Sequence, residues 1–347
     1  MKILINTPDI KLSGGVASHY RGLKKFWSLN VNYNIIGGRN KKQGLVLIFY
    51  DFVAFFIKCL FGNYSLIILN PSLGKTAIVR DAIFLKIAKI TKKKTIVFWH
   101  GWSKELVTKF NTDSSWFKQK YQYADMHLVL SSEFKKDLIN WGIKSPIKLT
   151  TTKVDDQLIM NCGIQQNDKL EFTILFLTRI EVYKGIFIVL EAFKELLKST
   201  TRVKLVIAGE GSQLKAAKEF TQKYKLENVN FLGNVSGEQL VQTFMSADIY
   251  ILPTFSEGMP TSVLEAMAFG LPIITRPVGG LNDFFEEYKM GFLIESFEPK
   301  DYSEKISYLI NNRDILNKIS NYNQSYAKKH FLGSKVAENL EKIFLNI

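Results

Sequence analysis

Cysteine is scarce in this 347-residue sequence, which has only two. Cys59 and Cys162 lie far apart and show neither a CxxC nor a Cys/His spacing, so they indicate no disulfide framework and no zinc site. Such cysteine use is typical of a reducing compartment. The first apolar run, residues 3–5, is too short for the core of a signal peptide. We therefore expect a cytoplasmic protein.

Apolar runs of membrane-spanning length are also lacking. The longest run, residues 45–61 (LVLIFYDFVAFFIKCLF), contains Asp51 and Lys58 and is too short and too charged to span a bilayer comfortably. We expect a buried strand followed by an amphipathic helix in this stretch.

Acidic residues are scarce in the first half of the chain. Residues 1–160 hold 25 Lys and Arg against 10 Asp and Glu, whereas the rest of the chain is nearly balanced, so the net charge of +14 comes from the first half. This charge indicates either a merely solvated surface or an anionic partner, namely membrane headgroups, a phosphate-bearing acceptor or nucleic acid. No helix-turn-helix, zinc or RRM pattern appears, so we expect no nucleic-acid partner. Peripheral contact with an anionic membrane is expected through the lysines at 86, 89 and 92–94.

The length exceeds the usual size of one hydrophobic core, so two domains are expected. Apolar strands alternate with helical patterns, which favours α/β domains in which helices cover both faces of a parallel sheet. Strands are expected at 3–6, 34–37, 66–69, 95–99 and 126–130, and then at 172–177, 204–208, 229–232, 248–252 and 272–275.

These patterns predict two doubly wound, Rossmann-like domains that face a central cleft. We expect the first domain at 1–160 and the second at 161–330, with a polar linker near 161–171. An amphipathic helix is expected within 331–347, and its apolar face needs another surface to pack on.

The most informative stretch is residues 247–277 (ADIYILPTFSEGMPTSVLEAMAFGLPIITRP). An apolar strand ends there before Pro253, and a helix is expected at 260–269 with Pro260 at its first position. Glu257 then lies in the loop, and Glu265 lies in the second turn of the helix. Carboxylates accept hydrogen bonds from paired hydroxyls, so the two glutamates could serve different parts of an extended ligand.

The same loop ends at the start of that helix. Amides near Gly258, Met259 and Thr261 are therefore suited to an anion.

Three further loops follow predicted strands. Gly14 and Gly15 precede a helix, where glycine lets the backbone approach a ligand, although a glycine pair is also common in ordinary turns. Arg179 and Lys184 lie between a strand and a helix, where two cations could neutralise a pyrophosphate, although such residues are often surface charges. Gly209 follows another strand and could face a nucleotide.

His100 follows the strand at 95–99, at the sheet edge where ligands of the first domain are expected. A histidine there can hydrogen-bond to a sugar hydroxyl or polarise a group, and a structural role is the alternative. Among the other histidines, only His19, near the glycine pair, has a comparable position.

The chain resembles retaining glycosyltransferases of the GT-B fold, in the large E-x7-E group that is also called glycosyltransferase family four or group 1. The resemblance rests mainly on SEGMPTSVLEAMAFGLPIIT (256–275), and LTRIEVYKG, IAGEG, ADIYILP and VGG occur in the order typical of the family. It implies transfer of a sugar from a nucleoside diphosphate sugar, carrying UDP or GDP, to a glycan or lipid-linked acceptor, as in bacterial polysaccharide or lipopolysaccharide biosynthesis. It also implies that the final helix packs back on the first domain.

By this resemblance, Glu257 contacts the transferred sugar and Glu265 contacts the ribose. Arg179 and Lys184 hold the diphosphate, and His100 lines the active site near the donor sugar. The glycine pair at 14–15 forms a loop over the phosphates and the acceptor.

The sequence departs from the family pattern after the glycines at 279–280, where Leu-Asn-Asp replaces the usual Pro-Glu, and at 150–156, where the usual Asn-Gly is missing. It has no Asp-x-Asp motif, so we expect no metal and no other cofactor. A nucleotide-sugar epimerase of the same fold is the alternative enzyme.

Overall fold

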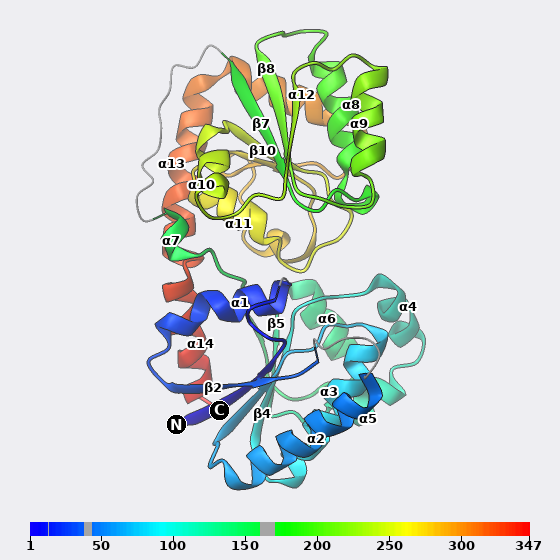
Figure 1. Ribbon diagram of the computed structural model, residues 1–347, viewed down its shortest axis with the longest axis vertical. Coiled ribbons are helices and arrows are strands. Elements are labelled where there is room, and N and C mark those ends of the chain that lie inside the picture. Colours follow the sequence, from blue (N-terminus) through cyan, green and yellow to red (C-terminus); the bar gives the residue numbers. More distant parts are fainter. Residues whose placement is uncertain (13, 38–43, 160–170) are drawn as a thin grey trace. The chain divides into compact units, whose positions relative to one another are not determined.

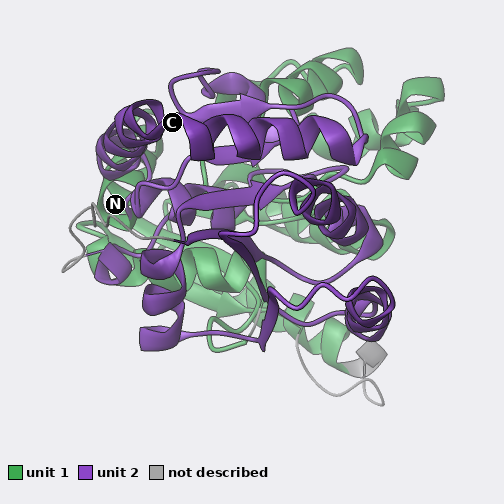
Figure 2. Ribbon diagram, turned by 90° about the horizontal axis from the view of Figure 1, so that it is seen from above, with its two compact units in different colours: residues 1–153, 333–347 green, residues 154–332 purple. Residues whose placement is uncertain are grey.

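The computed structural model describes residues 1–12, 14–37, 44–159 and 171–347 (Figure 1). The chain forms two compact units (Figure 2). Unit 1 consists of residues 1–153 and 333–347, and unit 2 consists of residues 154–332. The predicted boundary at 160/161 and nearly all of the predicted linker lie outside the described residues, as does Cys162.

Unit 1 contains a parallel sheet of six strands in the order β2-β1-β3-β4-β5-β6. The strands are β1 (Lys2–Thr7), β2 (Asn30–Ile35), β3 (Leu66–Leu69), β4 (Lys94–Trp99), β5 (Met126–Val129) and β6 (Ile147–Leu149). The helices are α1 (Gly15–Leu23), η1 (Lys24–Phe26), α2 (Gly44–Phe61), α3 (Lys75–Ile90), α4 (Lys104–Thr112), α5 (Ser115–Tyr121), α6 (Ser132–Asn140) and α14 (Gly333–Leu345). The central strands are buried along their length because helices cover both faces of the sheet.

Unit 2 contains a second six-stranded parallel sheet, in the order β12-β11-β10-β7-β8-β9. The strands are β7 (Phe172–Leu177), β8 (Val203–Ala208), β9 (Val229–Gly233), β10 (Ile249–Leu252), β11 (Ile273–Thr275) and β12 (Gly291–Leu293). The helices are α7 (Asp156–Ile159), η3 (Val182–Lys184), α8 (Ile186–Leu196), α9 (Leu214–Lys223), α10 (Gly237–Ser246), α11 (Thr261–Ala268), η4 (Gly279–Asp283), α12 (Pro299–Asn311) and α13 (Arg313–His330). The predicted α/β fold with two parallel sheets is confirmed.

Each sheet has a topological switch point, where the strand order changes direction. It lies between β1 and β3 in unit 1 and between β7 and β10 in unit 2. In open α/β sheets, ligands bind beyond the carboxyl ends of the strands at such points. The loops that follow these four strands are therefore the candidate ligand-binding loops.

The last helix, α14, packs on α1 within unit 1. Its Glu341 carboxylate accepts hydrogen bonds from the backbone N–H groups of Ser28 (2.7 Å) and Leu29 (2.8 Å). The rings of Trp27 and Phe344 lie next to each other. The chain thus returns to unit 1 after completing unit 2.

Two local predictions are wrong. Residues 45–61 are not a strand followed by a helix, because helix α2 covers the whole stretch. Asp51, Phe55 and Cys59 are buried at a spacing of four residues, which is a helical pattern. The strand predicted at 34–37 lies earlier, at Asn30–Ile35. It is a polar edge strand, so the apolar signal for it was weak.

Candidate active site

The unit 2 site forms where the loops after β7 and β10 meet at the switch point. The Phe255 N–H donates to the Tyr183 carbonyl (2.8 Å), and the Thr254 hydroxyl donates to the same carbonyl (3.2 Å). These bonds join two segments that are about seventy residues apart in the sequence. The predicted cationic loop and the predicted glutamate loop therefore lie side by side.

Lys184 and Glu257 form an ion pair at this junction, with the Lys184 Nζ donating to Glu257 Oε1. Their side chains are only 10% and 13% exposed. The Thr254 hydroxyl lies 3.1 Å from the same carboxylate oxygen. Removal of these two charges from water is costly unless each charge is paired with the other, so each side chain fixes the position of the other.

Two glycines allow this close approach. Gly185 has a left-handed backbone (φ +85°), and a Cβ there would lie 2.4 Å from the Pro253 carbonyl oxygen. Gly279 is also left-handed (φ +54°), and its Cβ would lie 2.2 Å from the Glu257 carbonyl oxygen. The Gly280 N–H donates to the Gly258 carbonyl (2.8 Å). The Val-Gly-Gly turn therefore supports the Glu257 loop from behind, even though the residues after it depart from the family pattern.

Helix α11 begins at Thr261, one residue later than predicted, and Pro260 is its N-cap in an extended conformation (ψ 104°). The placement of Pro260 at the first helical position is thus wrong by one residue. Gly258 and Met259 precede the cap, and Glu265 lies in the second turn, as expected from the sequence.

Tyr250 links the end of β7 to α11. Its hydroxyl donates to the Leu177 carbonyl (2.9 Å) and pairs with the Ser262 hydroxyl (2.7 Å). Burial raises the pKa of Tyr250 above its ordinary value, and the negative charges of Glu257 and Glu265 raise it further. Both glutamates of the motif therefore act electrostatically on one buried hydroxyl.

The other two predicted unit 2 positions lie at the same edge of the sheet. Arg179 is exposed, and its guanidinium lies 5.7 Å from the centre of the Tyr183 ring, which Lys184 Nζ approaches to 5.6 Å. Gly209 follows β8, and its N–H donates to the Gly233 carbonyl (2.7 Å). Two cations thus lie near one aromatic ring.

In unit 1, the corresponding cluster joins His100, Asn70 and Tyr20. Asn70 Nδ2 donates to the Asn6 carbonyl (2.8 Å), which leaves Asn70 Oδ1 as an acceptor. That oxygen accepts from the Tyr20 hydroxyl (2.6 Å) and lies 2.9 Å from His100 Nε2. His100 therefore carries its proton on Nε2 and has an acceptor lone pair on Nδ1.

Burial lowers the pKa of His100 to about 3, so the ring is neutral near pH 7. His19, on α1, lies with its ring centre 5.4 Å from that of His100. Among the described residues it has no hydrogen-bond partner for either ring nitrogen. Burial, followed by the charges of His100 and Lys153, lowers the pKa of His19 as well.

The glycine pair lies at the start of α1. Gly14 has φ +148°, and a Cβ at Gly14 or Gly15 would meet no atom within 4 Å. The backbone here has open space beside it. Ser13, which precedes the pair, lies outside the described residues.

Sequence reasoning missed Asn70, Tyr20, Thr254 and Arg276. Asn70 directly follows the apolar strand LIIL, and that position was the available signal. Arg276 follows β11, donates to the Glu295 carbonyl (2.7 Å) and stacks on Phe297. Over the described residues, no group of three or more His, Cys, Asp or Glu side chains is arranged to hold a metal ion.

The chain is similar to known glycosyltransferases in sequence and in fold. Residues 163–326 match the family model described as "Glycosyl transferases group 1". An uncharacterized glycosyltransferase of Methanocaldococcus jannaschii is 24% identical over 276 residues, which cover 76% of this chain and 70% of that protein. The capsular polysaccharide biosynthesis glycosyltransferase CapM of Staphylococcus aureus is 24% identical over 62% of this chain and 56% of its own length. Anabaena HepE, solved in complex with UDP, shares the fold with a TM-score of 0.77 at 16% identity, and the match covers 100% of both chains.

The two Rossmann-like units and their switch-point loops define the GT-B class of α/β proteins. The sequence match concerns unit 2, where residues 163–326 match the group 1 glycosyltransferase model. The M. jannaschii relative, which is named as a glycosyltransferase, matches a longer part of the chain.

Proposed function

We propose that this protein transfers a sugar from a nucleoside diphosphate sugar, carrying UDP or GDP, to an acceptor with retention of anomeric configuration. The observation that carries the proposal is the Lys184–Glu257 pair, which places a cation and a carboxylate together at the switch point of unit 2. A nucleoside diphosphate sugar offers both matching groups, namely anionic phosphates and sugar hydroxyls.

Each unit 2 residue then has a chemical role. Lys184 and Arg179 hold the diphosphate and offset the charge that develops on the leaving group. Glu257 accepts hydrogen bonds from hydroxyls of the transferred sugar, and Glu265 accepts them from the ribose. Amides at the start of α11, after Gly258, Met259 and Pro260, add donors for an anion. Gly209 lets the loop after β8 pack against the loop that carries Arg179, because a Cβ there would lie 2.0 Å from the Thr178 carbonyl oxygen, and both loops then face the nucleotide.

His100 contributes through Nδ1. Because this nitrogen is an acceptor, it can receive a hydrogen bond from a sugar hydroxyl, and a neutral ring cannot act as a cationic acid. The glycines at 14–15 leave space for phosphates or acceptor beside the backbone. Retention proceeds on one face of the sugar, with the leaving phosphate assisting deprotonation of the acceptor. No protein nucleophile and no metal ion is required, and Glu257 positions the sugar.

The acceptor that we propose is a lipid-linked or growing surface polysaccharide. CapM is named for capsular polysaccharide biosynthesis, and HepE was solved with UDP, which supports both the acceptor class and the donor class. The basic unit 1 further supports peripheral contact of a cytoplasmic protein with the inner face of a bacterial cell membrane. Over the described residues, every helix is too short or too polar to cross a bilayer.

The test is incubation of the purified protein with UDP- and GDP-sugars, with and without candidate acceptors. We expect a glycosylated acceptor and free nucleoside diphosphate, with the donor's anomeric configuration kept in the product. An altered sugar on an intact nucleotide, formed without acceptor, would instead identify an epimerase, which the names of the relatives do not favour.

A further inference from the structure

Helix α2 presents a row of large apolar side chains to solvent. They recur at helical spacing and lie on its outer side: Ile48, Phe49, Val53, Phe56, Ile57, Leu60 and Phe61. Phe49 is 70% exposed and Phe61 is 74% exposed. Single exposed apolar residues are ordinary, but a contiguous row of this size marks an interaction surface.

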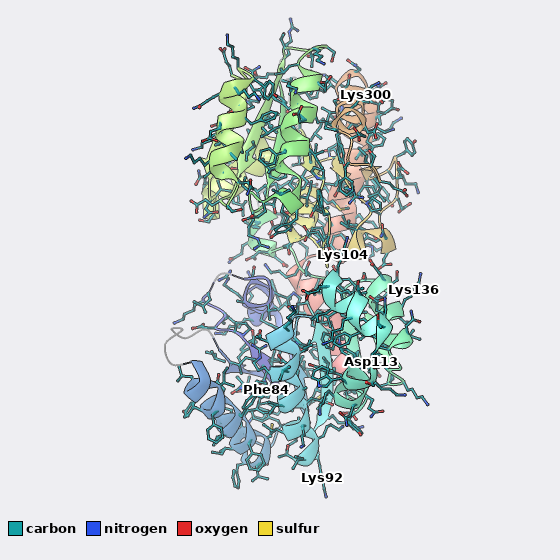
Figure 3. The ribbon with its side chains drawn as sticks, turned by 90° about the vertical axis from the view of Figure 1, so that its right-hand side faces the viewer. Phe84, Lys92, Lys104, Asp113, Lys136 and Lys300 are labelled. Carbon is teal, nitrogen blue, oxygen red and sulfur yellow. The ribbon has the colours of Figure 1, made fainter. Side chains whose placement is uncertain are left out.

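The inner side of the same helix is already packed. Phe55 and Cys59 are buried, and the rings of Phe52 and Phe55 lie 4.8 and 4.9 Å from the ring of Phe84 on α3. Figure 3 shows this side of unit 1, where α2 and α3 run next to each other and Lys92 lies just beyond α3. The core of unit 1 is therefore packed by the inner side of α2, and the exposed outer row does not contribute to it.

The apolar surface continues across α3 to α5. Val79, Ile83 and Ile90 are exposed on α3. A groove of about 700 Å³ lies between the two helices, with Trp116 and Tyr123 on its far side. The outer row of α2, these α3 residues and the groove are called the α2–α3–α5 face below.

The charges on this face are positive. Lys86, Lys89 and Lys120 line the groove, and none of its described lining residues is a carboxylate. Two carboxylates lie near these lysines, and both are in ion pairs. Asp125 pairs with Lys89 at 2.8 Å, and Asp81 is buried on the inner side of α3, where it pairs with Arg80. Lysines 92–94 follow the end of α3. The face therefore combines exposed apolar side chains with a cationic border.

We infer that the α2–α3–α5 face docks on an anionic lipid bilayer, with the outer row of α2 buried among the acyl chains and the lysines next to the headgroups. The apolar side chains come from α2, α3 and the groove, and the cations come mainly from α3, α5 and the residues after α3, so apolar insertion and headgroup attraction act on one face. Each lysine near the surface adds attraction of up to about 1 kcal/mol to anionic lipid. A second copy of this chain fits the face less well than a bilayer does, because a symmetric contact would bring the same lysines together and they would repel each other.

The inference deepens the proposed membrane contact by naming the surface, and it adds insertion to charge attraction. Lysines alone would give binding that salt abolishes. Insertion of phenylalanines gives binding that salt weakens but does not abolish, because burial of apolar area is insensitive to screening.

The experiment is flotation of the full chain with phosphatidylcholine vesicles, with and without phosphatidylglycerol, at low and high salt. We expect binding that requires phosphatidylglycerol and is partly retained at high salt. The triple variant Phe49→Ser, Phe56→Ser, Phe61→Ser should lower the partition coefficient at least about tenfold. The pair Lys86→Glu, Lys120→Glu should lower it at low salt only.

Matched controls lie on the other side of the unit 1 sheet. Leu345→Ser removes an apolar side chain that is 61% exposed on α14, and Lys24→Glu reverses an exposed charge in η1. Both should bind vesicles like the wild type. Equal binding by the Phe triple variant, or binding abolished by salt alone, would overturn the inference. The inference would also be overturned if the wild type formed a dimer without lipid and the triple variant were a monomer, because the face would then serve self-association.

Two further readouts separate this inference from the proposed function. Amide exchange of α2 in the wild type should slow when anionic vesicles are added, and unchanged exchange would contradict insertion without use of any variant. Stabilisation of the Phe triple variant by a nucleotide sugar should match that of the wild type. If vesicle binding holds and no nucleotide sugar stabilises either protein, the proposed function fails and the docking surface stands.

Discussion

Lys184 and Glu257 are 73 residues apart in sequence, and their side chains form one ion pair between the loops after β7 and β10. The pair joins the two motifs that the family resemblance treats separately, the Arg/Lys loop and the E-x7-E stretch. It means that the group proposed for phosphate and the group proposed for sugar hold each other in place.

Coupling between these residues is the first prediction. Lys184→Met or Glu257→Gln alone leaves a poorly solvated charge without its partner, which should reduce the unfolding free energy by about 3 kcal/mol. The double variant should lose clearly less than the sum of the two single losses. Denaturant unfolding of all four proteins measures this coupling. Strict additivity would show that the pair does not form in solution.

The Val-Gly-Gly turn gives the second prediction. In Gly279→Ala, a new Cβ would collide with the Glu257 carbonyl, so we expect a loss of about 1–3 kcal/mol in stability together with weaker binding of the donor. Gly233→Ala is the control, because Gly233 has a similar positive φ (+68°) with open space beside it. If both variants lose the same stability and keep donor affinity, the turn does not support the Glu257 loop.

The third prediction concerns the tautomer of His100. Nitrogen-15 NMR of imidazole-labelled protein should show the proton on Nε2 at pH 7. Asn70→Asp places a carboxylate beside the ring and should raise the pKa of His100, which would make activity depend on pH in the range of an ordinary histidine. Tyr20→Phe keeps the Asn70 acceptor and should leave the tautomer unchanged. A proton on Nδ1 in the wild type would refute the assignment.

The fourth prediction is that stability falls on acidification. Burial lowers the folded-state pKa of His100 to about 3 and of His127 to about 4, and it lowers that of His19. Because the ordinary pKa is about 6.5, the unfolded chain takes up these protons first as pH falls. The stabilisation is complete above that pH and is lost progressively below it.

Each of these histidines contributes up to about 1.4 kcal/mol per pH unit in that range. Denaturant unfolding between pH 7 and pH 5 should therefore show a steep decline in the unfolding free energy. In His100→Gln the slope should be smaller than in the wild type, because one of the protons that the unfolded chain takes up in this range is removed. A flat profile over this range would contradict burial of neutral histidines.

The parallel sheets were predictable because most of their strands are continuous apolar runs. LIIL at β3 and FTILFL at β7 were found with the bounds that the structure has. Strands β6 (IKL) and β12 (GFL) were missed because a lysine or a glycine within three residues leaves no continuous apolar run, and β2 was misplaced because polar residues alternate along an edge strand. Helix α2 was misread because its apolar side chains face solvent as well as the core, which hides the one-sided pattern of a globular helix.

The sequence predicted where the candidate site residues lie relative to the strands, but it did not predict which of them are in contact. Local sequence was enough to predict that Glu257, Lys184 and His100 each follow a strand. Because the carboxyl ends of parallel strands lie at one edge of a sheet, it also predicted that these residues lie at the edge where ligands bind. That Lys184 meets Glu257 depends on β7 and β10 being neighbours, which strand order alone decides. The Asn70–His100 bond likewise joins the ends of β3 and β4. Local patterns carry no information on these pairings.

The donor site in unit 2 is tested most directly by thermal unfolding with a panel of UDP- and GDP-sugars, on the wild type and on Lys184→Met. A ligand that binds the folded protein raises its melting temperature by mass action. We predict that nucleotide sugars of one base raise the melting temperature of the wild type and leave that of the variant nearly unchanged. The same rise in both proteins, or no rise with any nucleotide sugar, would contradict the account.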